Sequence, residues 1–233
     1  CSSDLCDGDT GCIGTFSAAN ALIGDVANNR VGSGGVTALT NGNYVVSSPL
    51  WDTVSTANVG AVTWGNGNGG TVGVVSASNS LVGSTADDGV GGLIRVLTNG
   101  NYVTRTLNWD DGATSNVGAV TWGNGNGGTV GAVSAANSLI GSTANDQISS
   151  EGLVALTNGH YVVASSNWDS PSLSDVGAVT WVNGASGLVG AVSASNSLTG
   201  DTASQKVGNS GLTTLTNGHY VIFSSLWGVA LAR

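Results

Sequence analysis

The chain repeats itself, and this repetition constrains its fold more than any other feature of the sequence. Residues 58–73 (NVGAVTWGNGNGGTVG) recur letter for letter at 116–131 and in a looser form at 175–190. The phrase LTNG begins at Leu39, Leu97, Leu156 and Leu215, which sets the period at 58 or 59 residues. A fixed period of this kind is the signature of a repeat architecture, in which each repeat buries its apolar face against its neighbours. A functional site should therefore also occur in copies.

The composition favours short β-strands joined by tight turns. Only 8% of the residues are charged, whereas 38 of the 233 are Gly and none is Met. Val, Thr and Trp suit strands, and Gly and Asn suit turns. In the second copy, four segments have the pattern of strands: 59–64, 71–77, 92–97 and 101–106. The phrase GNGNGG joins the first two, and an Asn-Gly pair between the last two predicts an antiparallel hairpin with a two-residue turn.

The two ends of the chain add up to one repeat. Residues 11–14 align with residues 70–73, so the sequence starts partway through a repeat, and it stops six residues past Trp227. With the ends joined, the spacing from Asn196 around to Asn20 is 57 residues (37 plus 20), close to the period of the other copies. A β-propeller closes in this way, because one blade takes strands from both termini and no sheet edge stays free.

We therefore predict an all-β protein, a β-propeller of four four-stranded blades that forms a single repeat domain over residues 1–233. Its repeats are roughly 15–73, 74–131, 132–190 and 191–233, the last completed by residues 1–14. The alternative is a β-solenoid, because 58 residues divide into three coils of about 19 residues.

Four motifs follow one another along the chain: LTNG[NH]YVV, a Trp-Asp pair, VGAVTW with its Gly/Asn turn, and VSAxNSL. In this order they resemble a tandem repeat of large bacterial surface and adhesin-like proteins, a family without an assigned function. Two positions depart from the pattern, since Leu5 occupies the Trp position of the first copy and Gly228 replaces the last Asp. More distantly, the arrangement is similar to propeller lectins, in which each blade presents an aromatic ring and a few polar groups to a sugar.

The cysteines favour a secreted or cell-surface protein. All three lie in the first twelve residues: Cys1, Cys6 and Cys12. A Cys6–Cys12 bridge is plausible in an oxidising compartment, with Cys1 free or linked to another chain. Three aspartates of DLCDGDTG, Asp4, Asp7 and Asp9, have the alternation of calcium ligands, but no Glu closes the loop and the other copies lack them. We therefore predict no metal and no cofactor.

Charge and sequence motifs exclude several classes of function. The net charge of -9 provides no basic stripe for nucleic acid, and no apolar run approaches the roughly 18 to 20 residues of a membrane helix. His160 and His219 occupy a turn position that is Asn43 and Asn101 in the other copies, and neither has a repeated acidic neighbour. We therefore predict no catalytic residues and no enzymatic activity.

Tryptophan gives the best candidate site. One set of tryptophans lies inside the VGAVTW strand: Trp64, Trp122 and Trp181. A second set follows the YVV strand, and three of its members precede an aspartate: Trp51-Asp52, Trp109-Asp110, Trp168-Asp169, and Trp227 alone. An indole covers the apolar face of a pyranose while a carboxylate accepts hydrogen bonds from its hydroxyls. Asn66 and Asn124, on the Gly/Asn turns, could add amide hydrogen bonds.

These residues predict a non-catalytic, multivalent carbohydrate-binding protein, a lectin or adhesin module whose partners are glycans. Several weak sites on one scaffold would bind a branched glycan through effective concentration. The alternative is a purely structural or protein-binding repeat in which every Trp is core, and two chains could also pair into a larger assembly. If the carbohydrate hypothesis holds, Trp109→Ala weakens glycan binding and leaves the melting temperature within a few degrees.

Overall fold

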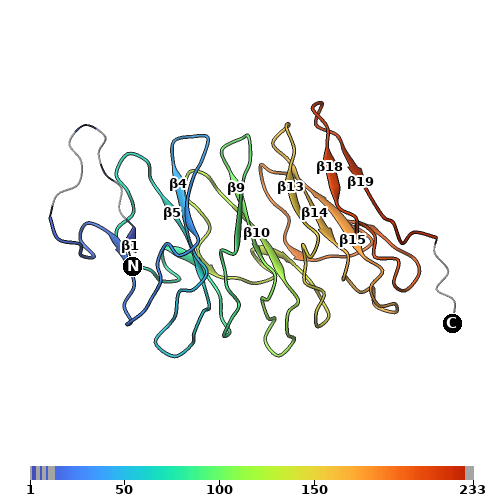
Figure 1. Ribbon diagram of the computed structural model, residues 1–233, viewed down its shortest axis with the longest axis horizontal. Helices are drawn as coiled ribbons and strands as arrows, with labels where there is room; N and C mark the ends of the chain where they lie inside the picture. Colours follow the sequence, from blue (N-terminus) through green and yellow to red (C-terminus); the bar gives the residue numbers. More distant parts are fainter. Residues whose placement is uncertain (1, 4–5, 7–8, 10–13, 229–233) are drawn as a thin grey trace. The chain divides into compact units, whose positions relative to one another are not determined.

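The computed structural model describes residues 2–3, 6, 9 and 14–228, and the statements below concern these residues (Figure 1). Their regular structure consists of nineteen short β-strands and contains no helix, which confirms the all-β prediction. Accordingly, no described segment forms a helix long and apolar enough to cross a bilayer.

Each repeat contributes the same kinds of strand. The LTNG hairpins comprise β3 (Gly35–Ala38) with β4 (Tyr44–Ser48), β8 (Leu93–Val96) with β9 (Tyr102–Thr106), β13 (Gly152–Ala155) with β14 (Tyr161–Ser165), and β18 (Leu212–Thr214) with β19 (Tyr220–Ile222). The VGAVTW motif forms β5 (Ala61–Gly65), β10 (Ala119–Gly123) and β15 (Ala178–Val182). The NSL motif forms β2 (Leu22–Ile23), β7 (Ser80–Val82), β12 (Ser138–Ile140) and β17 (Leu198–Thr199). Two-residue strands follow the Gly/Asn turns as β6 (Gly73–Val74), β11 (Gly131–Ala132) and β16 (Gly190–Ala191), and β1 is Ser2–Ser3.

The predicted hairpins are confirmed, but their turn is one residue longer than expected. In the first hairpin, the Leu39 N–H donates to Asn43 O at 2.8 Å and the Gly42 N–H donates back to Leu39 O at 3.2 Å. Gly42 has φ of 87°, a left-handed conformation that glycine adopts without steric cost. A turn followed by a left-handed glycine is the usual three-residue hairpin loop. Asn41, the residue before this glycine, therefore does not adopt a left-handed backbone conformation. Its side chain can contact other parts of the chain.

The chain divides into two compact units, which are described separately. The first comprises Cys1–Val96, Gly100–Thr106 and Gly123–Val133, and the second comprises Leu97–Asn99, Leu107–Trp122 and Ser134–Arg233. The first contains a sheet ordered β3-β4-β5-β7-β11 and a smaller sheet ordered β1-β2-β6. The second contains a sheet ordered β13-β14-β15-β17, the pair β18-β19, and the strands β10, β12 and β16 paired in that order.

Consecutive repeats are joined by parallel strand pairs. Strand β6 pairs in parallel with β2, β11 with β7, and β16 with β12, each time joining the NSL strand of one repeat to the short strand of the next. The four consecutive segments of the predicted blade therefore do not form a sheet of their own, since β5 and β6 lie in different sheets. The NSL strand was missed in the sequence, and the four-bladed ring stays a prediction.

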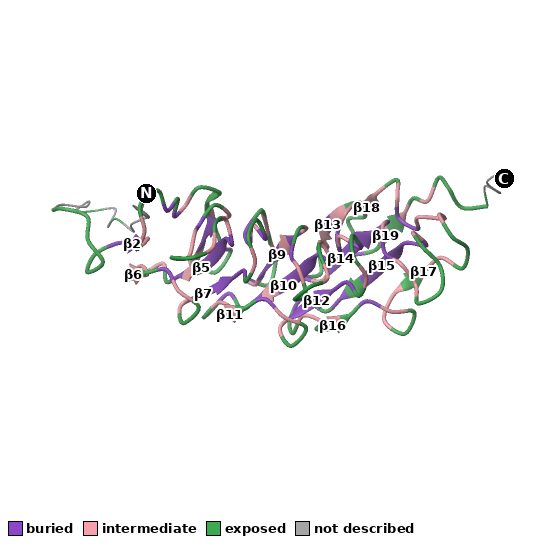
Figure 2. Cartoon of the chain, turned by 90° about the horizontal axis from the view of Figure 1, so that it is seen from below, coloured by how far each residue is buried: buried purple, intermediate pink, exposed green. Residues whose placement is uncertain are grey.

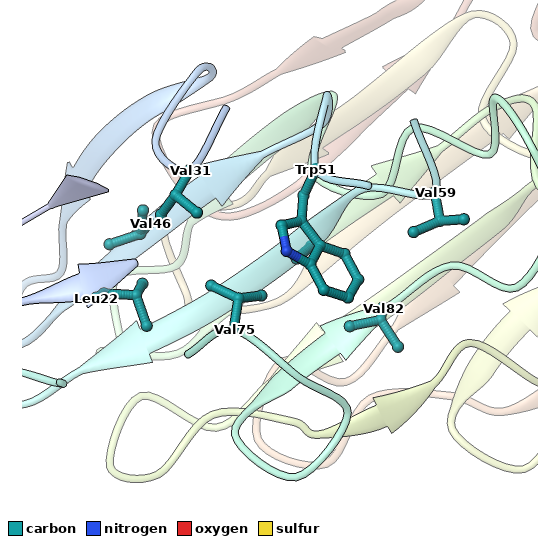
Figure 3. Close-up of a cluster of buried hydrophobic side chains, with 8 residues drawn as sticks. Leu22, Val31, Val46, Trp51, Val59, Val75 and Val82 are labelled. Carbon is teal, nitrogen blue, oxygen red and sulfur yellow. The ribbon is translucent and has the colours of Figure 1, made fainter. Parts of the chain in front are cut away.

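The core lies between strands of successive repeats. Figure 2 shows the buried residues concentrated on the strands and the exposed residues concentrated on the loops. In the first compact unit, Trp51 extends into a cluster with valines from the next repeat, among them Val75 and Val82 (Figure 3). In the second unit, Leu156, Val162 and Val207 belong to a second such cluster. A repeat therefore completes its core with side chains of its successor.

Candidate functional site

The tryptophans of the predicted Trp-Asp sites are core residues in three of the four copies. Trp51, Trp109 and Trp168 are buried, and their indole N–H groups have no hydrogen-bond acceptor among the described residues. A buried indole cannot present its face to a pyranose, so these three side chains stabilise the repeat by their apolar area. Trp227 differs, because 57% of its surface is exposed.

The aspartates that follow them close their own loops. The Asp52 carboxylate oxygen Oδ1 accepts the backbone N–H of Asn58 at 2.7 Å, six residues further along the chain. Asp169 accepts the N–H of Asp175 in the same way at 2.6 Å, and Asp110 repeats the contact in its own copy. A carboxylate that accepts a backbone N–H forms a strong, charge-assisted hydrogen bond. This contact explains the Trp-Asp pair without a ligand.

The asparagines proposed as amide donors support turns. Asn66 and Asn124 are exposed, and each places its Oδ1 within 2.8 or 2.9 Å of the backbone N–H two residues on. Side-chain oxygens of Asn commonly mimic a backbone turn in this manner. The structure therefore separates these asparagines from the buried Trp-Asp tryptophans rather than bringing them together around one pocket.

The backbone carbonyl of Gly125 accepts hydrogen bonds from three side chains that were not predicted as site residues. Gly125 O accepts the Trp64 indole N–H at 2.9 Å, and the side-chain amides of Asn41 and Asn43 each donate to it at 2.8 Å. Gly184 O accepts Trp122 Nε1 at 2.8 Å in the corresponding place. The donors belong to one repeat and the acceptor to the Gly/Asn turn of the next.

Close approach explains the glycines of these turns. A Cβ placed on Gly125 would lie 1.9 Å from the carbonyl oxygen of Gly100, so only glycine fits at this position. The LTNG motif, the Trp of VGAVTW and the GNG turn recur together along the chain. Their joint recurrence indicates the contact with the Gly125 carbonyl. The Gly/Asn turn, expected from the sequence to be a simple loop, is therefore a junction between repeats.

Two buried aspartates were also missed. Asp146 accepts four hydrogen bonds, from the backbone N–H groups of Ser142, Thr143 and Asp169 and from the Thr143 hydroxyl, at 2.6 to 3.0 Å. Asp88 is buried as well and holds the matching Ser-Thr loop of the second repeat. Both aspartates follow closely after a GSTA motif, and this motif could have indicated them in the sequence. These bonds satisfy the carboxylates within the protein.

The histidines behave as turn residues. His160 Nδ1 accepts the backbone N–H of Gly184 at 3.2 Å, as the Asn43 side chain accepts that of Gly67 at 3.1 Å. The His160 ring also makes an edge contact with Trp181, with ring centroids 4.9 Å apart. His219 is exposed. Glu151, the only glutamate, accepts the hydroxyl of Ser166 at 2.6 Å.

No three His, Cys, Asp or Glu side chains lie together among the described residues. The Cys6–Cys12 pairing and the Asp4–Asp7 part of the calcium alternative lie outside those residues, since Cys1, Cys12, Asp4 and Asp7 are not described.

In the first two LTNG hairpins the tyrosine packs over the glycine that ends the VGAVTW strand, Tyr44 over Gly65 and Tyr102 over Gly123. Tyr102 lies directly over Gly123, where a Cβ would come within 2.1 Å of the ring. Burial raises the pKa of the Tyr102 hydroxyl to about 12, and a hydrogen bond with the backbone of Thr129 lowers it to a smaller extent. In the third copy Val182 replaces this glycine, and the buried hydroxyl of Tyr161 has no hydrogen-bond partner within the described part of the chain. Burial raises the pKa of that hydroxyl as well.

One open hollow lies beside a predicted site residue. Asp52 lines it together with the loop residues 53–57 and Val26 and Ala27, and its volume is about 340 Å³. The hydroxyl groups of Thr53, Ser55 and Thr56 make the lining polar, and none of the described residues that line it is aromatic. Of the predicted Trp-Asp pair, only the aspartate faces this hollow.

Comparison with known families agrees with the repeats seen in the sequence and the structure. Four segments of the chain, residues 4–33, 38–92, 96–150 and 155–209, match a family model described as a repeat of unknown function (DUF5650). A search of curated proteins gave no significant match. Because the matched segments cover most of the sequence, the chain belongs to the DUF5650 family of repeats.

Proposed function

We propose that this chain is a non-catalytic structural and protein-binding repeat module of a secreted or cell-surface protein. One observation carries the proposal: the recurrent Trp and Asp residues of the first three copies are used by the repeats themselves. Trp51, Trp109 and Trp168 fill cores, the aspartates after them close loops, and Trp64 and Asn41 join one repeat to the next. A module of this kind presents its surface to another protein rather than a pocket to a small molecule.

The resemblance to bacterial surface and adhesin-like proteins supports the secreted or cell-surface location. The acidic net charge of -9 supports a partner other than nucleic acid.

Carbohydrate binding is the second candidate, and the hollow beside Asp52 supports it. Polar hydroxyls around an open depression of about 340 Å³ suit the hydroxyl groups of a sugar. In this version the multivalent lectin would bind through its loops, and the indoles of Trp51, Trp109 and Trp168 would contribute only by holding those loops.

A glycan array with the intact chain separates the two candidates. We expect no sugar to bind above background and no agglutination of cells. Binding that simple sugars inhibit, and that Asp52→Ala removes without loss of folding, would contradict the structural proposal and favour the lectin.

The finer architecture is also a proposal. Parallel pairs between successive repeats, such as β11 with β7, support the solenoid alternative, in which coils add to one another along an axis. A propeller blade would instead complete its sheet from its own four strands. We propose an open array of repeats, and small-angle scattering that fits a closed four-bladed ring would contradict it.

A further inference from the structure

The second repeat departs from the others by two arginines on one hairpin. Arg95 lies in β8 and Arg105 in β9, and together they are two of the five basic residues of the chain. Counted from the LTNG motif, the same two positions are uncharged in the other copies: Thr37 and Ser47, Val154 and Ala164, Thr213 and Phe223. Because the other copies form the same hairpin without these charges, the fold does not require the two arginines.

The two arginines lie on the same face of the hairpin. Strands β8 and β9 are antiparallel, with Leu93 opposite Arg105 and Arg95 opposite Val103. Residues that lie opposite one another share a face of the sheet, and so do residues two apart along a strand. Arg95 and Arg105 are therefore diagonal neighbours, a separation that long side chains can span. A ligand on this face can contact both guanidinium groups.

The position of Arg105 is unfavourable for a positive charge. Its side chain is half-buried, and its counterparts Ser47 and Ala164 are 3% and 0% exposed. Burial lowers the pKa of the Arg105 guanidinium, and the charge of Arg95 lowers it further. Both effects disfavour the charged form, and an anion placed beside the two guanidinium groups offsets both of them.

Strand β8 offers an open backbone edge beside the arginines. It is the last strand in the order of its sheet, so one of its sides has no neighbouring strand within the described part of the chain. Arg95 is exposed on this strand and makes no hydrogen bond or ion pair with another described residue. Charged residues on edge strands commonly prevent aggregation, but this role does not explain Arg105, because β9 is an inner strand.

We propose that β8 binds an extended acidic segment of a partner protein as an added strand. A glutamate opposite Arg95 meets its guanidinium directly, and a glutamate opposite Leu93 lies in the same row as Arg105. Guanidinium groups bind carboxylates through two parallel N–H···O bonds, which makes arginine well suited to this contact. The inference rests on the proposed protein-binding function and gives the chemistry of the partner.

The strand edge and the charge of the chain are the arguments for this partner. Addition of a strand to an open edge is a recurring mode of peptide recognition, in which backbone hydrogen bonds give affinity and side chains give specificity. Only another peptide backbone presents N–H and C=O groups at the spacing of this edge. The net charge of -9 repels an acidic segment from the surface as a whole, so its contact is confined to the hairpin that carries the arginines.

Peptide binding to the intact chain tests the proposal. The probe is a short fluorescent peptide in which Glu alternates with Thr, and the comparison peptide has Lys in place of each Glu. Fluorescence anisotropy should show saturable binding of the acidic peptide alone, and this binding should weaken as the salt concentration rises. Hydrogen exchange should slow at the backbone amides of β8 when the peptide binds, a change that attraction between side-chain charges alone does not produce.

Substitutions taken from the other copies remove each arginine with a residue that the hairpin already accommodates. Arg95→Thr introduces the residue of the first copy, and Arg105→Ala introduces that of the third. Each should weaken peptide binding about ten- to hundredfold, the loss expected for a hydrogen bond to a charged group. Arg95→Lys should recover part of the binding, because it keeps the charge and loses the planar fork.

A matched control removes a charge outside the hairpin. Arg30 is exposed in the first repeat, so Arg30→Ala should bind the acidic peptide as tightly as the wild type. The melting temperature of Arg95→Thr should equal that of the wild type. That of Arg105→Ala should be equal or higher, because this variant removes a partly buried charge.

Three results would overturn the proposal. One is equal binding of the acidic and the Lys peptides, and another is undiminished binding by folded Arg95→Thr and Arg105→Ala variants. The third is binding that leaves hydrogen exchange in β8 unchanged, or that heparin displaces at a lower concentration than unlabelled peptide, since a sulfated glycan would then be the better ligand of the arginines. Failure of the peptide to bind leaves the structural role of the repeats intact, which inhibition by simple sugars in the glycan array would contradict.

Discussion

Replacing Trp51 by Ala tests whether the recurrent tryptophans are core residues. Trp51 is buried among Leu22, Val31 and valines of the next repeat. An aromatic side chain of this kind buries about 150 to 250 Å². At about 25 cal/mol per Å² this area corresponds to about 4 to 6 kcal/mol, an upper estimate that agrees with the about 3 to 5 kcal/mol observed for truncating large aromatics.

We therefore expect Trp51→Ala to reduce the free energy of unfolding by about 4 kcal/mol. For a chain of this length, 1 kcal/mol shifts the melting temperature by about 2 to 4 °C, so the expected loss is about 8 to 16 °C. Differential scanning calorimetry measures the shift, and urea titration followed by circular dichroism gives the free energy. Trp109→Ala should behave in the same way.

Two further variants make the test specific. Trp227→Ala is the matched control, because an exposed side chain costs within about 0.5 kcal/mol when truncated. Trp51→Phe keeps most of the apolar area and loses no hydrogen bond, since the indole N–H has no acceptor among the described residues. Its cost should lie between those of the other two variants. A Trp51→Ala protein that melts within about 2 °C of the wild type and loses binding to a glycan would refute the core assignment.

Three further predictions follow from the hydrogen bonds and the buried tyrosine. Because the folded pKa of Tyr102 is about 12 against an ordinary 10.0, its burial stabilises the fold fully below pH 10, and about 3 kcal/mol should be lost as the pH rises to about 12. Urea titrations across that range should show a shallower loss in Tyr102→Phe, and an unchanged slope would contradict the assignment. His160→Leu should cost about 1 to 3 kcal/mol by leaving the Gly184 N–H without its acceptor, whereas His160→Asn should be nearly neutral; equal urea midpoints for both variants would disprove the contact. Asp169→Ala should cost about 1.5 to 3 kcal/mol through the lost bond from the Asp175 N–H, and a melting temperature equal to that of the wild type would show that the loop does not need it.

The hairpins could be predicted from the sequence because their signal is local. An Asn-Gly pair between two apolar runs specifies a reversal of the chain within a few residues. The two-residue turn was wrong because the pair is compatible with two loops that differ only in the conformation of the Asn. In the structure Gly42 is left-handed and Asn41 is not, which lengthens the loop by one residue.

The pairing between repeats could not be predicted in this way. The NSL strands have two or three residues, too few to show a hydrophobic period, and their partners such as β11 have only two. A ladder of this length is held in place by the packing around it rather than by its own sequence. The repeat period shows that neighbours must pack, but it does not show which strands meet.

The Trp-Asp pair illustrates the same limit for function. An aromatic residue and an acid at the end of a strand suit a sugar site, and they equally suit a core residue followed by a loop cap. The direction of the Trp51 indole decides between them, and it depends on the valines of the next repeat. Much of the cluster that holds the indole, including Leu22 and Val82, lies far from Trp51 in the sequence.

In a tandem repeat, recurrence alone cannot separate copies of a binding site from copies of a junction, but the outermost copy can. A residue that contacts a soluble ligand needs the same exposure in every repeat. A junction residue is buried wherever the next repeat follows, and it becomes exposed in the last described copy. The Trp position after YVV and the leucine of the NSL motif both change from buried to exposed at Trp227 and Leu198. Their recurrence is therefore explained by the contact between repeats.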